Sequence, residues 1–152
     1  MQNSPYLCLT ENRINITFEV KMVKERILVV DDEQDMLDFA KRILTRGGFK
    51  VITASDGKEG LEKVYSEAPD LMILDIVMPG MDGWEVCRKI RGDPLYKHLP
   101  IIMLTVRRTK ADQLKGFDLG GDEYITKPFY SNELLARVKT VLQRSSGRIS
   151  RE

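Results

Sequence analysis

"RILVVDD", residues 26–32, joins a run of aliphatic residues directly to two adjacent carboxylates. Apolar runs of similar length recur at residues 51–54, 71–74 and 101–104, and residues 123–126 form a weaker fifth run. Continuous β-branched and aliphatic runs predict strands that are buried on both faces of a sheet. The quoted stretch is therefore expected to be a buried strand that is followed at once by acidic residues.

Segments with helical spacing alternate with these runs. Apolar residues recur at that spacing within residues 36–44, 61–68, 84–90 and 134–142. Alternating strands and helices indicate an α/β domain, in which helices cover both faces of a doubly wound parallel sheet. Five strands favour the flavodoxin-like (βα)5 fold with the strand order 2-1-3-4-5.

The composition indicates one domain without a global attraction to nucleic acid or membranes. The chain has 152 residues, 42% of them hydrophobic, and 24 basic against 23 acidic side chains. Cys8 and Cys87 have no metal-binding spacing and make a poor disulfide framework, which favours a reducing, cytoplasmic location. No stretch approaches the roughly 20 apolar residues that span a bilayer, so we expect no membrane partner.

The strand and helix pattern occupies residues 26–144. Residues 1–25 lie outside it and are either a flexible leader or an extra edge strand, since "INITFEV" at residues 14–20 alternates apolar and polar side chains. Residues 145–152 are polar and are expected to be a tail or the start of a linker.

Polar side chains stand where the expected strands end. Asp31 and Asp32 follow the first strand, Asp75 and Thr105 end the third and fourth, and Lys127 follows the fifth. The carboxyl ends of parallel strands frame the ligand crevice of such a sheet, so these five side chains are expected to converge.

The convergent residue types point to phosphoryl chemistry. Clustered carboxylates repel one another and require a cation, and oxygen ligands without His or Cys favour Mg²⁺. Lys127 supplies a second positive charge and Thr105 a hydroxyl donor. Such a site suits a phosphoryl group, with Asp75 as the nucleophile that forms an aspartyl phosphate.

Four motifs, "ILVVDDE", "LMILDIVMPGMDG", "IIMLTV" and "DEYITKPF", resemble the receiver domains of two-component response regulators, the CheY-like family. The resemblance runs from about Lys24 to Arg144. It implies a signalling switch rather than an enzyme, in which Asp75 accepts a phosphoryl group from a sensor histidine kinase or a phosphotransfer protein.

The resemblance also implies the role of each site residue. Asp32, Asp75 and the backbone carbonyl of Val77 would ligate Mg²⁺, and Asp31 would hold it largely through water. Lys127 would contact the phosphate. Thr105 would be the switch hydroxyl, and Tyr124 the aromatic residue that turns inward. Lys127-Pro128 is a candidate cis peptide bond.

The C-terminal part, "ADQLKGFDLGGDEY" and "SNELLARVKTVLQR", resembles the winged-helix class of response regulators. That class would dimerise on phosphorylation through the face of the fourth helix, fifth strand and fifth helix. Opposite charges at matching positions support such a face: Lys115 with Glu133, Glu123 with Arg137, and Asp122 with Arg144. The alternative is a solvated charged face. We expect no DNA-binding module within residues 1–152, and the polar tail is either a linker to one or the end of a single-domain regulator.

Other interpretations fit the sequence less well. "GGDE" at residues 120–123 spells a cyclic di-guanylate cyclase signature, but only 28 residues follow Tyr124. A phosphatase of the haloacid-dehalogenase type needs a second Asp where Val77 stands, and a flavin carrier needs a phosphate-binding loop where "VVDDEQD" is acidic.

His98 is expected to be a surface residue rather than a phosphate relay. Val77 and Val106 favour slow hydrolysis of the phosphorylated state.

Overall fold

The computed structural model describes residues 23–106 and 120–151, with side chains through Ser146. The strands are β1 (Arg26–Val30), β2 (Lys50–Ala54), β3 (Leu71–Asp75), β4 (Ile101–Thr105) and β5 (Glu123–Thr126). The helices are α2 (Gln34–Arg46), α3 (Gly57–Glu67), α4 (Gly83–Arg91) and α6 (Ser131–Arg151). The helix expected between the fourth and fifth strands lies outside the described residues, and so does the leader or edge strand expected within residues 1–22.

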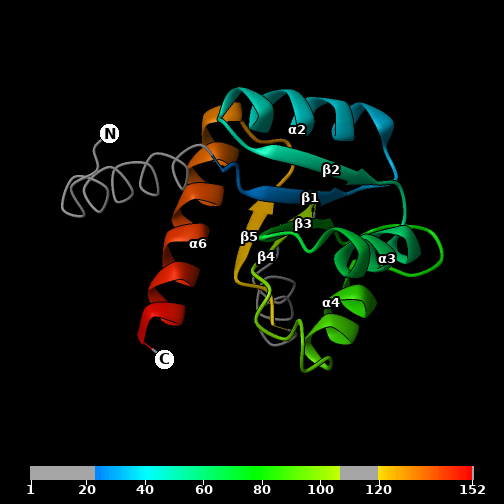
Figure 1. The fold of residues 1–152 in the computed structure, drawn as a ribbon. Coiled ribbons are helices and arrows are strands. Elements are labelled where there is room, and N and C mark those ends of the chain that lie inside the picture. The colour runs from blue at the N-terminus through cyan, green and yellow to red at the C-terminus, as the bar shows by residue number, and fades with distance from the viewer. Residues whose placement is uncertain (1–22, 107–119, 152) are drawn as a thin grey trace, which may run out of the picture.

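The five strands form one parallel sheet in the order β2-β1-β3-β4-β5, which confirms the predicted fold class (Figure 1). The register places Asp75 of β3 opposite Leu104 of β4, and Thr105 opposite Thr126 of β5. All strands therefore end at the same edge of the sheet, and neighbouring strands end within one residue of each other in register. This edge is called the carboxyl edge below.

Two hydrophobic cores cover the two faces of the sheet. Alternate residues of β1 divide between them: Ile27 and Val29 face the core under α2 and α6, while Leu28 and Val30 face the core under α3 and α4. All four side chains are fully buried. Complete burial of an aliphatic side chain stabilises the fold by about 1.5–3 kcal/mol, which explains why these runs are continuously apolar rather than alternating.

The ends of the helices follow from local chemistry. Asp56 and Asp82 cap α3 and α4 by accepting hydrogen bonds from the backbone N–H groups of Glu59 and Glu85. After α2, Gly48 takes a φ of +94°, a conformation that suits glycine.

Helix α6 continues past the expected boundary at Arg144 as far as Arg151. Residues 145–151, which the sequence suggested as a tail or linker, therefore extend this helix. Among the helices of the described residues, none is both long and apolar enough to cross a bilayer.

Candidate functional site

The carboxyl edge of the sheet brings the expected site residues together. Asp31 directly follows β1, and Asp75 and Thr105 are the last residues of β3 and β4. The backbone N–H of Lys127, just after β5, donates a 2.7 Å hydrogen bond to the carbonyl oxygen of Thr105. The peptide bond between Lys127 and Pro128 is cis, as the sequence suggested.

Three carboxylates form a compact cluster at this edge. One oxygen from each of Asp31, Asp32 and Asp75 lies within 4.8 Å of the other two. Asp31 is fully buried and Asp75 is 4% exposed, whereas Asp32 is open to solvent. The cluster is therefore a half-buried acidic pocket with one open side.

Lys127 reaches across the edge into this cluster. Its Nζ atom lies 2.7 Å from Oδ2 of Asp31, 3.5 Å from Oδ1 of Asp75 and 3.6 Å from Oε1 of Glu33. Burial opposes the charge of the ammonium, but the hydrogen bond to Asp31 and the surrounding carboxylates outweigh it and raise the pKa of Lys127. The lysine is thus fully charged at neutral pH.

The surroundings of Asp75 disfavour its ionised form. Burial and the neighbouring charge of Asp31 raise the pKa of Asp75 from 3.8 to about 7, although Lys127 acts in the opposite direction. Three carboxylates against one ammonium leave two negative charges when all are ionised. A divalent cation would balance them, and a cluster of oxygen donors without His or Cys suits Mg²⁺.

The switch candidates lie beside this cluster. Thr105 is fully buried at the end of β4. Tyr124 of β5 is half-buried and packs against the core beneath α3 and α4. Val77 and Val106, which follow β3 and β4, have side chains that are 52% and 65% exposed.

The candidate dimer face is only partly described. Lys115 lies outside the described residues, and Glu133 is half-buried near the start of α6. Glu123 forms ion pairs within the chain, with both Arg137 and Arg144 at 3.1 Å.

Asp122, which the sequence matched with Arg144 across a dimer interface, forms its contacts within the chain with Arg91 and β4. Its Oδ2 atom accepts hydrogen bonds from Arg91 at 2.9 Å and from the backbone N–H of Ile101 at 2.8 Å. Arg91 also donates to the carbonyl oxygens of Gly120, Lys97 and Leu99. Sequence reasoning missed this network, since one Arg among several on a helix gives no sign of its partners. It also missed Glu33, although that residue directly follows the acidic pair.

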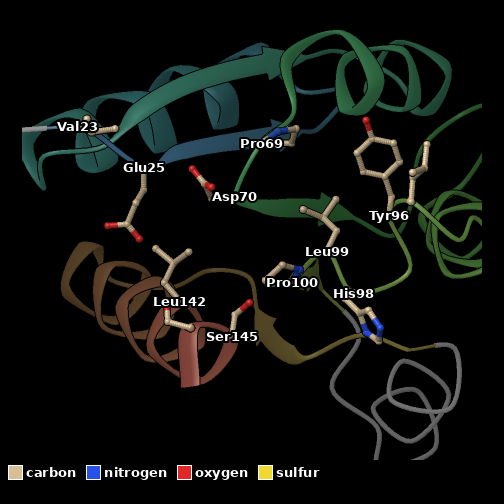
Figure 2. A pocket seen from close by; sticks show the side chains of 12 residues that line it. Val23, Glu25, Pro69, Asp70, Tyr96, His98, Leu99, Pro100, Leu142 and Ser145 are labelled. Atoms are coloured by element: carbon tan, nitrogen blue, oxygen red, sulfur yellow. The ribbon is translucent and has the colours of Figure 1, made fainter. Parts of the chain in front are cut away.

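A cavity lies at the other edge of the sheet, where the strands begin. It has a volume of about 770 Å³ and is lined by residues that precede β1, β3 and β4 and by part of α6 (Figure 2). None of the expected site residues lines it. His98 does, so this histidine lies at the edge opposite Asp75, away from the acidic cluster.

The comparisons with known proteins agree with this geometry. A family model described as the response regulator receiver domain matches residues 27–139. The chain belongs to this receiver-domain family. It is 46% identical over 123 residues to the alkaline phosphatase synthesis transcriptional regulatory protein PhoP of Bacillus subtilis, covering 81% of this chain and 50% of that protein. The chain spans about half the length of the curated relatives it matches.

Solved structures of receiver domains share the fold. A CheY-like receiver domain protein of Methanospirillum hungatei superposes with a TM-score of 0.77 at 32% identity, covering 83% of this chain and 99% of that chain. Chemotaxis protein CheY4 of Vibrio cholerae gives a TM-score of 0.75 at 32% identity, covering 78% and 99%. The receiver domain is the phosphorylation-dependent signalling domain of two-component response regulators, so the function class predicted from the motifs is confirmed. Receiver domains bind Mg²⁺ in an acidic pocket, and the aspartate cluster is able to hold such an ion.

Proposed function

We propose that Asp75 of this receiver domain is the phosphoacceptor, and that a sensor histidine kinase or a phosphotransfer protein is the donor. The observation that carries the proposal is the position of the Asp75 carboxylate, at the carboxyl edge between two other aspartates and the ammonium of Lys127. Asp31 is already held by Lys127 at 2.7 Å, and Asp32 lies on the open side of the pocket. Asp75 is the carboxylate that could ligate a metal ion while it also lies 3.5 Å from the ammonium of Lys127.

The reaction is a transfer of one phosphoryl group. An oxygen of Asp75 attacks phosphorus, the bond from phosphorus to the histidine nitrogen of the donor breaks, and an acyl phosphate forms on Asp75. Asp32, Asp75 and the carbonyl of Val77 would hold Mg²⁺, with Asp31 acting largely through water, and the ion would neutralise charge on the phosphoryl oxygens. Lys127 would contact the same phosphoryl group from the side of Asp31. The domain thereby acts as a switch and not as a turnover enzyme.

Thr105 and Tyr124 would read the phosphorylated state. The buried Thr105 lies one residue beyond the strand partner of Asp75, so its hydroxyl is suited to donate to a phosphoryl oxygen. Movement of Thr105 would open space for Tyr124, which lies on the neighbouring strand and packs against the core beneath α3 and α4. The location in the cytoplasm stays a prediction.

A phosphorylation-dependent homodimer would use the face of β5 and α6. Glu123 binds both Arg137 and Arg144 within one chain, so an intersubunit pair requires these arginines to exchange partners. Arg137→Glu is therefore expected to keep the phosphorylated chain monomeric in sedimentation experiments without preventing its phosphorylation. Lys139→Glu, on another exposed part of α6, is the matched control. Dimerisation of the Arg137 variant would exclude this face.

Intact mass after incubation with acetyl phosphate and Mg²⁺ tests the phosphoacceptor. The parent chain is expected to gain one phosphoryl group, and Asp75→Asn to gain none. Asp38→Asn, an exposed aspartate on α2, is the control and should behave as the parent does. Labelling of the Asp75 variant would move the phosphoacceptor to another residue.

A further inference from the structure

Gly83 lies directly against the backbone that carries the phosphoacceptor. It is the first residue of α4, and its N–H donates a 2.8 Å hydrogen bond to the carbonyl oxygen of Ile76. We propose that Gly83 is a positioning residue, which sets the Asp75–Val77 backbone where its carboxylate and carbonyl oxygens can bind Mg²⁺. The inference rests on the role of Asp75 in the proposed function.

Space, and not backbone conformation, makes glycine necessary here. Gly83 is a helical residue, and it is absent from the glycines with positive φ, so an L-residue could adopt its conformation. A Cβ atom at this position would overlap the carbonyl oxygen of Asp75 and lie 2.7 Å from Cα of Ile76. Both obstacles are backbone atoms, which cannot rotate away as a side chain can. A methyl group must therefore displace either the Asp75–Ile76 peptide or the start of α4.

Gly57 restrains the far end of the same loop. It begins α3, and a Cβ atom there would lie 2.7 Å from the carbonyl oxygen of Met81 and 2.8 Å from Cγ2 of Val86. The loop from Ile76 to Asp82 is thus packed at both ends against the first turns of two helices. Gly80, within the loop, has a φ of +76° and open space around its Cα, so its glycine serves the turn instead.

This packing matters at a metal site, because ligand positions must hold to about 0.5 Å. The loop carries Val77, whose carbonyl oxygen belongs to the proposed ligand set, and it begins at Asp75 itself. A displacement of the Asp75–Ile76 peptide would move two proposed ligands at once. Supporting residues that orient metal ligands typically change metal affinity by about 10–100-fold when they are substituted.

Gly83→Ala and Gly92→Ala form a matched pair of variants on α4. Gly92 ends this helix with a φ of −83°, and a Cβ atom there would meet only carbonyl oxygens, the nearest at 3.4 Å. Mg²⁺ affinity is measured by NMR titration, following the carbonyl carbon of Val77, and folding by urea unfolding in a chelator. Gly83→Ala is expected to weaken Mg²⁺ binding roughly tenfold or more and to reduce the Val77 shift. Gly92→Ala should bind Mg²⁺ within about twofold of the parent.

The opposite result is equally well defined. Alanine favours helix more than glycine does. If Gly83 had no role beyond beginning α4, the Gly83→Ala variant would be more stable than the parent and would bind Mg²⁺ with parental affinity. That result would overturn the proposal while leaving Asp75 as phosphoacceptor. Failure of the parent itself to bind Mg²⁺ would instead overturn the proposed function.

Gly57→Ala covers the case in which Gly83→Ala does not fold. It changes the same loop from the other helix, and it is expected to weaken Mg²⁺ binding in the same direction. Loss of folding in both variants would assign the two glycines to the fold and would reject a specific role at the site.

Discussion

Replacing the proposed phosphoacceptor by its neutral amide should make the metal-free domain more stable. Burial and the charge of Asp31 raise the pKa of Asp75 to about 7, against an ordinary value of 3.8. Between these two values the unfolded chain releases the proton while the folded chain keeps it. The free energy of unfolding of the parent therefore falls as the pH rises from about 4 to about 7. Asp75→Asn removes this loss, because its side chain carries no proton to release.

The magnitude follows from the two pKa values. The raised pKa of Asp75 lowers the free energy of unfolding of the parent by roughly 2 kcal/mol at pH 5, where the folded carboxyl group keeps its proton, and by roughly 4 kcal/mol at pH 8, where it is ionised. Asp75 is 4% exposed, so solvent screens little of this cost. The variant should exceed the parent by these amounts in chelator. Mg²⁺ should then reduce the difference in free energy of unfolding between the variant and the parent. A Mg²⁺ concentration of 100 times the dissociation constant stabilises the parent alone by about 2.7 kcal/mol.

Urea unfolding at pH 5 and pH 8, each with chelator and with Mg²⁺, measures all four differences. Asp35→Asn, an exposed aspartate on α2, is the control and should change the free energy of unfolding by less than about 0.5 kcal/mol at either pH. The electrostatic reasoning is refuted if Asp75→Asn is no more stable than the parent at pH 8 in chelator. It also fails if the difference is the same at both pH values.

Three further substitutions have defined outcomes. Lys127→Met should abolish phosphorylation by acetyl phosphate. It should also lower the free energy of unfolding by about 3 kcal/mol at pH 7 in chelator, because it leaves the fully buried Asp31 without its ion-pair partner. Urea unfolding like that of the parent would contradict this. Arg91→Ala removes four hydrogen bonds and should cost about 3 kcal/mol, whereas the exposed Arg88→Ala on the same helix should cost less than about 0.5 kcal/mol. Val106→Ala should shorten the lifetime of the phosphorylated state roughly threefold, about 0.7 kcal/mol of barrier, in a mass-spectrometric decay assay; an unchanged lifetime would reject steric protection by Val106.

The sequence predicted the sheet and the core of the site for one reason. Strands buried on both faces leave long apolar runs, their alternation with helices predicts a parallel sheet, and five strands favour the order that the structure shows. Once the order is known, residues such as Asp31, Asp75 and Lys127 must meet at one edge, although 96 positions separate Asp31 from Lys127. Backbone topology alone brings them together, so the position of each residue on its strand was enough.

The same reasoning does not reveal the partners of long charged side chains within the chain. Asp122 binds Arg91, and Arg144 binds Glu123. The match of Asp122 with Arg144 across a dimer stays a prediction. A guanidinium reaches several acids from one backbone position, and exposed pairs differ by only about 0–1 kcal/mol, so spacing does not select the partner. Space around a glycine is equally hidden, because the atoms that crowd Gly83 at the start of α4 belong to Asp75, at the end of β3, and to Ile76, which follows it.

The destabilisation of Asp75 is a consequence of the strands that carry the site. β1 and β3 are buried on both faces, so the acids at their ends lie where the protein interior meets solvent. Burial that stabilises Ile73 and Leu74 also raises the pKa of Asp75, and Asp75→Asn removes the second effect only by removing the ionisable carboxyl group itself. A cost of roughly 4 kcal/mol is a large fraction of a domain's net stability of about 5–15 kcal/mol. The fold tolerates this cost because the apolar burial that stabilises the domain comes from the same strands. A cation that binds the ionised Asp75 carboxylate would replace the solvation that burial removes, and would therefore offset part of the cost.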